Sequence, residues 1–218
     1  TTEVWTDEGL FPFPFQKLSG ASMQHGCVSQ YSVARLGESF VFLSQDDRGQ
    51  GIVVLMNGYT PQRISTHAVE NDIGSGVMSD AIAFSYQQEG HEFYMLTFPT
   101  QDKTWVYDLA TQLWHKRSYR DNLNVYHRHR ANCCTLFKGM VLVGDYQNGM
   151  IYKLDRGTYT DNGMTIPRIR RCPHLTNDLK RQFFHDLQIQ FQPGVGLALG
   201  QGSDPKAILR WSDDGGST

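Results

Sequence analysis

Charge is scarce in this 218-residue chain, and long apolar runs are missing from it. Charged residues make up 19% of the sequence and the formal net charge is -2, so the chain as a whole has no attraction for nucleic acid or acidic membranes. Any contact with a polyanion must therefore be local. No run of about eighteen apolar residues occurs, and no charged segment followed by an apolar one opens the chain. Neither secretion nor a membrane span is supported.

Motifs of enzymes and cofactor sites are missing as well. The sequence contains no glycine-rich phosphate loop, no Gly-x-Ser-x-Gly elbow and no metalloprotease His-Glu pair, so we expect no cofactor and no enzymatic activity. The acidic, glycine-rich "SQDDRGQG" from Ser44 resembles a calcium loop but lacks the later acidic ligands of the EF-hand. We interpret it as a hairpin loop.

Cysteine is rare too, with four residues: Cys27, Cys133, Cys134 and Cys172. Adjacent residues of a strand point to opposite faces, so Cys133 and Cys134 have a poor geometry for a disulfide. We predict that the cysteines are reduced thiols in the core.

Glycine and aromatic residues are plentiful by contrast, and four stretches of the chain resemble one another. There are 21 glycines and 12% aromatic residues, which favour short strands joined by tight turns and predict an all-β fold. The repeats are "GIVVLMNGYTPQRI" from Gly51, "TWVYDLATQLWHKR" from Thr104, "MIYKLDRGTYTDNG" from Met150 and "KAILRWSDDGGST" from Lys206. Asn57-Gly58 predicts a two-residue type I′ hairpin in the first, and Asp108 to Gln112 a longer loop in the second.

Another apolar run precedes each repeat, starting at Gly37, Asp80, Ala131 and Phe183. These starts lie 43, 51 and 52 residues apart, close to the period of roughly 40 to 50 residues of β-propeller blades. We therefore predict a propeller-like array of four-stranded antiparallel blades. In the last run, Leu187, Ile189 and Phe191 alternate with glutamines, which predicts a strand. A β-sandwich strand would show the same alternation.

The aromatic residues of the second repeat are expected to lie across one hairpin. Trp105 and Tyr107 share a face of the ascending strand and Trp114 lies on the descending one, where such contacts add roughly 0.2 to 1 kcal/mol each. A carbohydrate-stacking platform is the alternative. Because Leu109 and Leu113 are nearby, we favour packing in the core.

The expected organisation is an N-terminal extended segment, residues 1–30, followed by a propeller-like β domain, residues 31–218. Four blades make a very small closed propeller, and closure is what removes exposed edge strands. The chain starts without methionine and stops inside a turn-like sequence. We expect a fragment of a longer protein, with the β domain incomplete at its C-terminus.

The C-terminal sequence contains an Asp box, the turn Ser-x-Asp-x-Gly-x-Thr. Its side chains bind backbone amides within the turn and its glycine takes the left-handed conformation. Asp boxes are structural turns of propellers and lie away from catalytic centres. The residues are Ser212, Asp214, Gly216 and Thr218.

Two basic stretches have a functional and a plainer interpretation. In "HRHR", His127 and His129 share a strand face and could bind a metal, but no third ligand is visible, and we favour hydrogen-bonded histidines. In "PRIRRCPH", Arg168, Arg170 and Arg171 could contact DNA phosphates in a channel. A solvated strand edge protected by charge is the plainer interpretation.

Residues 31 to 73, "YSVARLGESFVFLSQDDRGQGIVVLMNGYTPQRISTHAVENDI", resemble the packaged-DNA stabilisation proteins of short-tailed bacteriophages. The preceding "FPFQKLSGASMQHGCVS" and the C-terminal "RWSDDGG" are similar to theirs. In that family a strand-loop-strand carries three short motifs. They are Arg-Gly-x-Gly, Asn-Gly-Tyr-x-Pro and Arg-Ile-Ser-Thr-His, here Arg48 to Gly51, Asn57 to Pro61 and Arg63 to His67.

The resemblance implies a structural protein of the virion tail, a nozzle or hub with propeller-like β-structure that is made in the host bacterial cytoplasm. It implies a homo-oligomeric ring below the portal-adaptor ring, in contact with other tail proteins such as a needle, spike or fibre. Such a ring keeps packaged double-stranded DNA from leaking and provides the conduit for its ejection. No membrane contact and no catalytic motif come with the resemblance.

A glycan-binding or glycan-hydrolysing Asp-box propeller is the alternative function. Sialidase-like chemistry needs an arginine cluster, a tyrosine nucleophile and an acidic partner. Arg128, Tyr119 and Glu89 are of the right types, but nothing in their spacing selects them. A kelch-like interaction propeller is a third option, although its double-glycine signature is absent.

Overall fold

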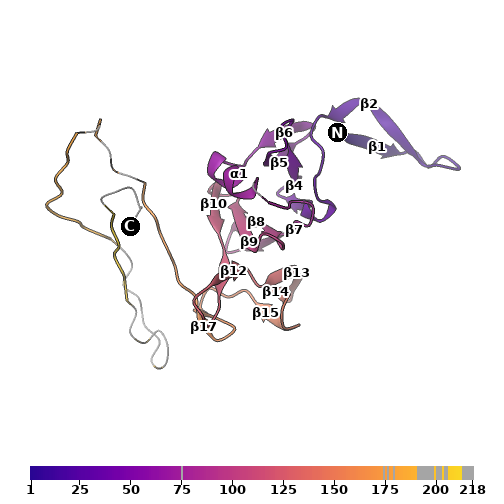
Figure 1. Ribbon diagram of the computed structural model, residues 1–218. Coiled ribbons are helices and arrows are strands. Elements are labelled where there is room, and N and C mark those ends of the chain that lie inside the picture. Colours follow the sequence, from indigo (N-terminus) through magenta and orange to yellow (C-terminus); the bar gives the residue numbers. More distant parts are fainter. Residues whose placement is uncertain are drawn as a thin grey trace. The chain divides into compact units, whose positions relative to one another are not determined.

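Strands dominate the computed structural model, which describes residues 1–74, 76–173, 175, 177–178, 180–190, 199, 203 and 206–212. Strands account for 45% and helices for 5% of the chain, and the strands form several small antiparallel sheets (Figure 1). No closed barrel forms among these residues. The predicted all-β class is confirmed. The chain divides into two units, Thr1–Arg156 and Gly157–Thr218, and the sheets described next belong to the first.

The first four-stranded sheet is a simple meander. It contains β3 (Ala34–Leu36), β4 (Ser39–Gln45), β5 (Gly51–Asn57) and β6 (Thr60–Arg63), in that order. Asn57 pairs with Thr60, so the loop between β5 and β6 is Gly58-Tyr59 and not the predicted Asn57-Gly58. Only Gly58 has a positive φ, 60°, which is the pattern of a type II′ turn. The register of the strands thus moves the predicted turn by one residue.

The second sheet has the same meander. It contains β7 (Ile82–Gln88), β8 (His91–Phe98), β9 (Lys103–Asp108) and β10 (Leu113–Lys116). Glu89 and Gly90 between β7 and β8 both have positive φ values, as a type I′ turn requires. Asp108 pairs with Leu113, which confirms the longer loop predicted for this hairpin.

The third sheet contains three strands among the described residues: β13 (Ala131–Phe137), β14 (Met140–Asp145) and β15 (Ile151–Lys153). A small hairpin of β11 (Ser118–Arg120) and β12 (Tyr126–Arg128) precedes it. Lys138 and Gly139 make a second turn of the type I′ pattern between β13 and β14.

The equivalent strands of the three sheets repeat more regularly than the sequence suggests. The first strands begin at residues 34, 82 and 131, which are 48 and 49 residues apart. The run from Gly37 that we aligned with the first strands is β4, the second strand of its sheet. Because β3 has only three residues, its apolar signal is too short to detect. The predicted spacing of 43 residues was therefore wrong, because it compared a second strand, β4, with a first strand, β7.

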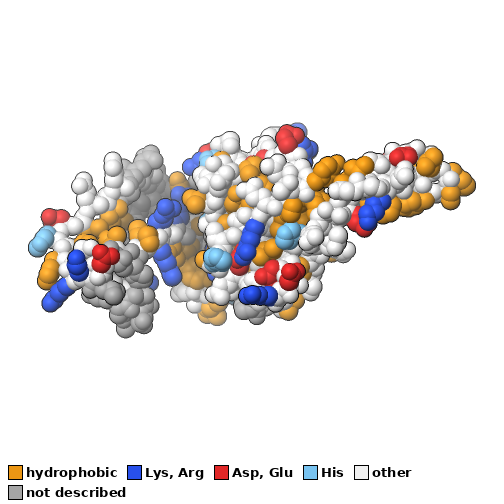
Figure 2. Space-filling model, turned by 90° about the horizontal axis from the view of Figure 1, so that it is seen from above, with side chains coloured by type: hydrophobic (Ala, Val, Ile, Leu, Met, Phe, Trp, Pro, Cys, Tyr) orange, Lys and Arg blue, Asp and Glu red, His pale blue; other side chains and the backbone are white. Residues whose placement is uncertain are grey.

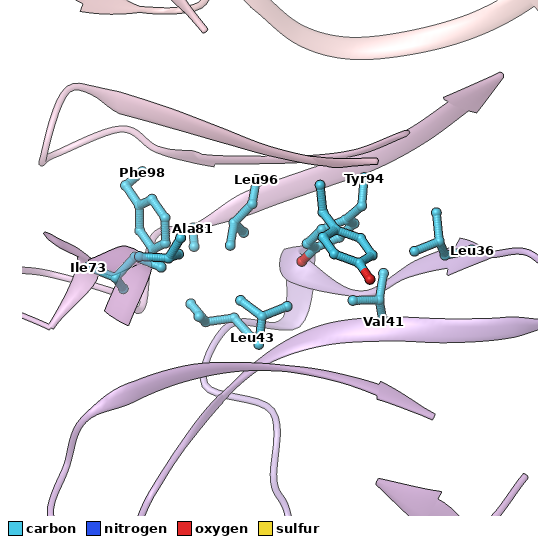
Figure 3. Packing of buried hydrophobic residues seen from close by; sticks show 11 residues of the cluster. Leu36, Val41, Leu43, Ile73, Ala81, Tyr94, Leu96 and Phe98 are labelled. Carbon is cyan, nitrogen blue, oxygen red and sulfur yellow. The ribbon is translucent and has the colours of Figure 1, made fainter. Parts of the chain in front are cut away.

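The sheets pack face to face through two apolar clusters. One cluster fills the space between the first two sheets. In it, Leu36, Val41 and Leu43 of the first sheet face Tyr94 of the second (Figure 3). The opposite face of the second sheet packs on the third sheet through Met95, Val106 and their neighbours. The first strands also lie near one another, since β3 contacts β7 and β7 contacts β13. A series of meanders packed in this way fits the predicted propeller-like array.

One helix and one hairpin complete the first unit. Helix α1 (His67–Ile73) lies between the first two sheets along the chain, and it buries Val69 and Ile73 in their shared cluster. Hairpin β1 (Thr2–Asp7) and β2 (Phe15–Met23) precedes the 3₁₀-turn η1 (Gln30–Ser32). Val4 and Met23 of this hairpin pack on the outer face of the first sheet.

The second unit contains one small hairpin among its described residues, β16 (Thr160–Asp161) and β17 (Met164–Thr165). Asn162 and Gly163 form its turn, both with positive φ. The strand predicted for the run from Phe183 is wrong within residues 183–190, which are exposed and form no strand. Alternation supplies an apolar face, but a strand also needs a neighbour for its backbone groups. Of the fourth repeat, residues 206–212 form no strand, and the remainder lies outside the described residues.

The predicted state of the cysteines is partly wrong. All four are free thiols, but Cys27, Cys133 and Cys172 are exposed. Cys134 is half-buried in the cluster between the second and third sheets. Strand alternation explains the difference between Cys133 and Cys134, because it turns Cys133 to the face of the third sheet on which the described residues form no apolar cluster.

Candidate functional site

The aromatic hairpin of β9 and β10 belongs to the core. Tyr107 and Trp114 pair across the two strands, with ring centroids 5.2 Å apart, and Trp105 meets Trp114 edge-on at 6.4 Å. Trp114 donates through Nε1 to the carbonyl of Ile64, 2.8 Å away. All three rings pack with the first sheet, so the core interpretation of this hairpin is confirmed.

Asp72 at the end of α1 joins the helix to the same hairpin. Its carboxylate accepts hydrogen bonds from Trp105 Nε1 at 2.8 Å and Lys116 Nζ at 3.1 Å. Lys103 Nζ donates to its backbone carbonyl at 2.8 Å. Burial opposes ionisation of Asp72, but these bonds outweigh burial and lower its pKa. The sequence analysis missed this ionic contact, because its members are far apart along the chain.

Glu70, on the same helix, is a buried carboxylate with a full set of partners. Its side chain is 3% exposed and forms a two-point ion pair with Arg63 of β6. Ser65 Oγ also donates to it, at 2.5 Å. Although burial raises the pKa of a carboxyl group, the bonds from Arg63 and Ser65 lower it overall. The helix itself was not predicted; the four-residue spacing of Val69 and Ile73 is the signal that could have revealed it.

Arg117 places a positive charge between the second and third sheets. It donates to Tyr86 Oη and to His115 Nε2, the latter at 3.2 Å, and it lies 5.2 Å from the Phe93 ring centre. Burial, and then the charge of Arg117, lower the pKa of His115 to about 4. The same two causes lower the pKa of His129 to about 4. Both imidazoles are therefore neutral at pH 7.

The "HRHR" histidines have hydrogen-bond partners, as we favoured. His127 Nδ1 lies 2.7 Å from Asp102 Oδ2, and its Nε2 lies 3.4 Å from Asp121 Oδ2. The bond to Asp102 is the main reason why the pKa of His127 is raised. His129 Nδ1 accepts from the backbone N–H of Ala131 at 3.1 Å. Among the described residues, no group of three or more potential ligands could hold a metal ion.

A shallow groove runs along the first strands of the three sheets. Its lining includes Arg35 and Glu38 from the first sheet, Gln87 and Glu92 from the second, and Leu136 from the third. Two of its carboxylates already have partners within the chain. Glu92 Oε1 accepts from the backbone N–H of Gly37 at 2.7 Å, and Glu38 lies 3.8 Å from Arg35. The bond from Gly37 to Glu92 joins the first sheet to the second, whereas the pair of Glu38 and Arg35 lies within the first.

The remaining predicted residues are spread over the molecule. Arg168, Arg170 and Arg171 are exposed and form no strand, and Arg168 lies 5.4 Å from the Tyr159 ring centre. Of the Asp box, Ser212 is described and exposed, whereas Asp214, Gly216 and Thr218 lie outside the described residues.

The "SQDDRGQG" loop is the hairpin loop that we expected. Asp46 Oδ1 accepts from the backbone N–H groups of Arg48 and Gln50, at 3.0 and 2.7 Å. Its carboxylate is thus used within the turn that joins β4 to β5.

The arginine, tyrosine and glutamate considered for a sialidase-like site each make a separate contact within the chain. Arg128 lies 3.7 Å from the Tyr146 ring centre, and Glu89 pairs with Arg156. The buried Tyr119 ring lies under Arg130, 3.5 Å away. The contacts of these residues therefore stabilise packing and do not form one acid-base-nucleophile cluster.

A comparison with known protein families decides the assignment. Residues 1–159 match the phage stabilisation family, described as "Bacteriophage P22 Gp10, beta-propeller". The chain belongs to this family. The match covers well over half of the chain and confirms the resemblance found in the sequence. No curated protein matches the chain.

Membership of the phage stabilisation family settles the broad function. The protein is a bacteriophage DNA-stabilisation protein with β-propeller structure, and a structural component of the virion that interacts with other virion components. The sheets that make up residues 34–153 all lie within the matched segment. No helix among the described residues is long and apolar enough to cross a membrane.

Proposed function

We propose that this phage stabilisation protein is part of a tail nozzle or hub that closes the portal channel, retains the packaged DNA and forms the conduit for ejection. The family match over residues 1–159 carries the proposal. The packed sheets support the proposal, because their buried charged side chains form ion pairs and hydrogen bonds within the chain. Such a protein acts through its shape and its interfaces, and it needs no acid, base or nucleophile.

The proposed partners are further copies of the chain in a ring, the portal-adaptor ring, and a needle, spike or fibre protein of the tail. Exposed apolar side chains outside the core support protein interfaces of this kind. Phe11 is 98% exposed and Leu136 is 72% exposed. The site of action is the virion tail, after synthesis in the cytoplasm of the host bacterium.

Arg168, Arg170 and Arg171 are the proposed contacts to DNA in the channel. All three are exposed, and their guanidinium groups can each contact a phosphate. With the low total charge of the chain, this limited set of contacts would hold DNA without preventing it from sliding. The Asp box from Ser212 is proposed as a structural turn.

The test is the DNA content of phage particles assembled without this protein. We expect such particles to package DNA and then lose it, so that the DNA becomes accessible to nuclease. Purified protein added to the particles before DNA is lost should restore retention, and an equal amount of heat-unfolded protein should not. Particles that keep their DNA without the protein would contradict the proposal.

A further inference from the structure

Hairpin β11–β12 lies at one end of the second and third sheets, next to their turns. Strand β12 lies near β9, and the backbone N–H of Arg128 donates to Asp102 Oδ1 in the β8–β9 turn, 2.9 Å away. Tyr146, in the turn between β14 and β15, lies against the Arg128 side chain. Successive sheets of a β-propeller pack on one another through their faces. That packing leaves uncovered the ends of the sheets, where this hairpin lies.

The strand register divides the hairpin into two faces. Tyr119 pairs with His127, and their stacked rings, 6.5 Å apart, occupy one face. The other face, here the arginine face, carries the side chains of the remaining two pairs: Ser118 with Arg128 and Arg120 with Tyr126. Arg120 and Arg128 are diagonal neighbours on this face, a relation that places Cα atoms about 7 to 8 Å apart. Two guanidinium groups can therefore reach one ligand from two sides.

The two arginines lack the acidic partners that most basic side chains of the first unit have. Figure 2 shows basic side chains next to acidic ones on one side of this unit. Arg120 and Arg128 form no ion pair with any residue that the structure describes. The carboxylate of the adjacent Asp121 accepts from two backbone N–H groups of its own turn and lies 3.4 Å from His127 Nε2. It is thus used within the turn and on the opposite face.

The arginine face offers hydrogen-bond donors that have no acceptor. Arg120 Nε is buried and has no partner in the described part of the chain. A buried donor without a partner costs free energy, and it can mark the place of a ligand. Arg128 is held 3.7 Å from the ring centre of Tyr146, a contact that orients its charge without neutralising it. The hydroxyl groups of Ser118 and Tyr126 likewise have no partner among the described residues.

We propose that the arginine face binds a phosphate group of the DNA backbone. Arginine, serine and tyrosine are among the residues that contact phosphate in protein–DNA complexes. One guanidinium group can satisfy a carboxylate with two parallel bonds, whereas two arginines and two hydroxyl groups match the more numerous lone pairs of phosphate oxygens. The contact is independent of base sequence, because phosphate is common to every nucleotide.

The inference rests on the proposed function, which brings packaged DNA to this protein. It adds a second contact site to the three arginines of residues 168–171. The new site lies within residues 1–159, which match the phage stabilisation family. Its position at the turns of the second and third sheets gives it a rigid support.

Titration of the 218-residue chain with inorganic phosphate, at constant ionic strength, tests the ligand class. We expect the NMR signals of the Nε–H groups of Arg120 and Arg128 to shift, and that of the exposed Arg48 to stay. Tyr126→Phe removes one hydroxyl group from a side chain that is 48% exposed. It should weaken phosphate binding about threefold and leave the urea midpoint unchanged. Signals of Arg120 and Arg128 that do not respond to phosphate would overturn the inference.

Competition distinguishes the sources of the bound group. Duplex DNA added to the phosphate-bound chain should displace phosphate from Arg120 at a lower concentration of anionic groups than poly-glutamate does. Equal or better displacement by poly-glutamate would overturn the inference and indicate an acidic protein partner. Phosphate that DNA does not displace would also overturn it, because the ligand would then be free phosphate.

DNA affinity measured by fluorescence anisotropy over a range of salt concentrations tests the residues. Arg120→Gln and Arg128→Gln should each weaken the binding of a short duplex about tenfold and reduce the slope of log affinity against log salt by about one. R120Q/R128Q should be only slightly weaker than either single variant, because both side chains hold the same phosphate. Arg48→Gln is the matched control, with the same loss of charge in another hairpin loop. Losses no larger than that of R48Q would overturn the inference.

Failure of this inference is distinguishable from failure of the proposed function. Phosphate binding is measured with the purified chain, whereas DNA retention is measured with phage particles. Particles that need the protein to retain DNA, together with an arginine face that binds no phosphate, would support the function and reject the site.

Discussion

Arg130 and Asp145 form an ion pair inside the protein, with Nη1 and Oδ2 2.7 Å apart. Their side chains are 4% and 0% exposed. Arg130 also lies over the ring of Tyr119, so one side chain joins hairpin β11–β12 to the third sheet. The bond from Arg130 helps to lower the pKa of Asp145 in spite of burial. Such a pair fixes how elements meet, which is what a structural component requires.

Breaking this pair should destabilise the protein strongly. Asp145→Leu leaves the Arg130 charge buried without its carboxylate, and we expect the free energy of unfolding to fall by about 3 to 5 kcal/mol. The double variant R130M/D145L removes both charges and should lose less than D145L alone. Urea unfolding at pH 7 measures both. A double variant that loses the sum of the losses of D145L alone and R130M alone, measured in the same way, would contradict the assigned pairing.

Acid should destabilise the fold through His115 and His129. Both have a pKa of about 4 in the folded protein, below the ordinary value of 6.5, so the unfolded chain binds more protons between these values. The free energy of unfolding should therefore fall as the pH is lowered through this window, by roughly 2 to 4 kcal/mol between pH 7 and pH 5. Urea midpoints measured across the window test this.

Two variants separate the histidines. His115→Gln should reduce the pH dependence by about half, because its amide can still accept from Arg117. His127 has the opposite sign: its raised pKa stabilises the fold at low pH and that stability is lost as the pH rises through the folded pKa. His127→Gln should therefore make the protein less stable at about pH 5 than at pH 7, relative to the unmodified chain. Parallel pH profiles for all three proteins would refute the assignment.

Tyr94 provides a test of the interface between the first two sheets. Its side chain is fully buried, and its Oη donates to the carbonyl of Ser32 at 2.7 Å. Tyr94→Phe removes the donor and should cost about 1 to 2 kcal/mol of unfolding free energy. Tyr31→Phe, at a residue that is 64% exposed, is the control and should cost almost nothing. Equal losses from both variants would argue against this packing.

Gly90 tests the turn between β7 and β8. Its φ is 81°, and no atom lies within 4 Å of the position that a Cβ would take. Gly90→Ala should therefore cost about 1 kcal/mol through backbone strain alone. Gly90→Asn should cost less, because asparagine tolerates the left-handed conformation. Equal unfolding midpoints for the alanine and asparagine variants would contradict a left-handed turn.

The three arginines of the proposed channel contact make a functional prediction. Replacement of Arg168, Arg170 and Arg171 by alanine should weaken DNA retention and reduce the salt dependence of DNA binding by up to about three counterions. Arg48→Ala, in a hairpin loop, is the control. Phage particles carrying the triple variant can be tested for nuclease-accessible DNA. Unchanged retention would remove these residues from the proposed DNA contact.

The sequence predicted local hairpins better than their grouping into sheets. Trp105, Tyr107 and Trp114 could be paired because their contact depends on a few neighbouring residues. In the first sheet, the second strand was matched with the first strands of the other sheets, because β3 is very short. The turn at Gly58 lies one residue later than predicted, because register depends on the whole sheet. The run from Phe183 has strand alternation but no strand in residues 183–190.

The contacts between charged side chains could not be predicted from the sequence alone. Asp72 meets Trp105 and Lys116 only after α1 has packed against the second sheet, and no local pattern signals this. His127 was correctly expected to be hydrogen-bonded, but its partners Asp102 and Asp121 could not be named. Long-range ion pairs depend on the tertiary fold, whereas turns and alternation depend on neighbours along the chain.

The most direct test of the central claim is an electron cryomicroscopy map of the intact phage tail, with the position of this protein identified in the map. The account predicts a ring of copies around the channel axis, next to the portal-adaptor ring, with the packaged DNA ending at or inside the ring. Copies attached to the outside of the tail and away from the channel would contradict it.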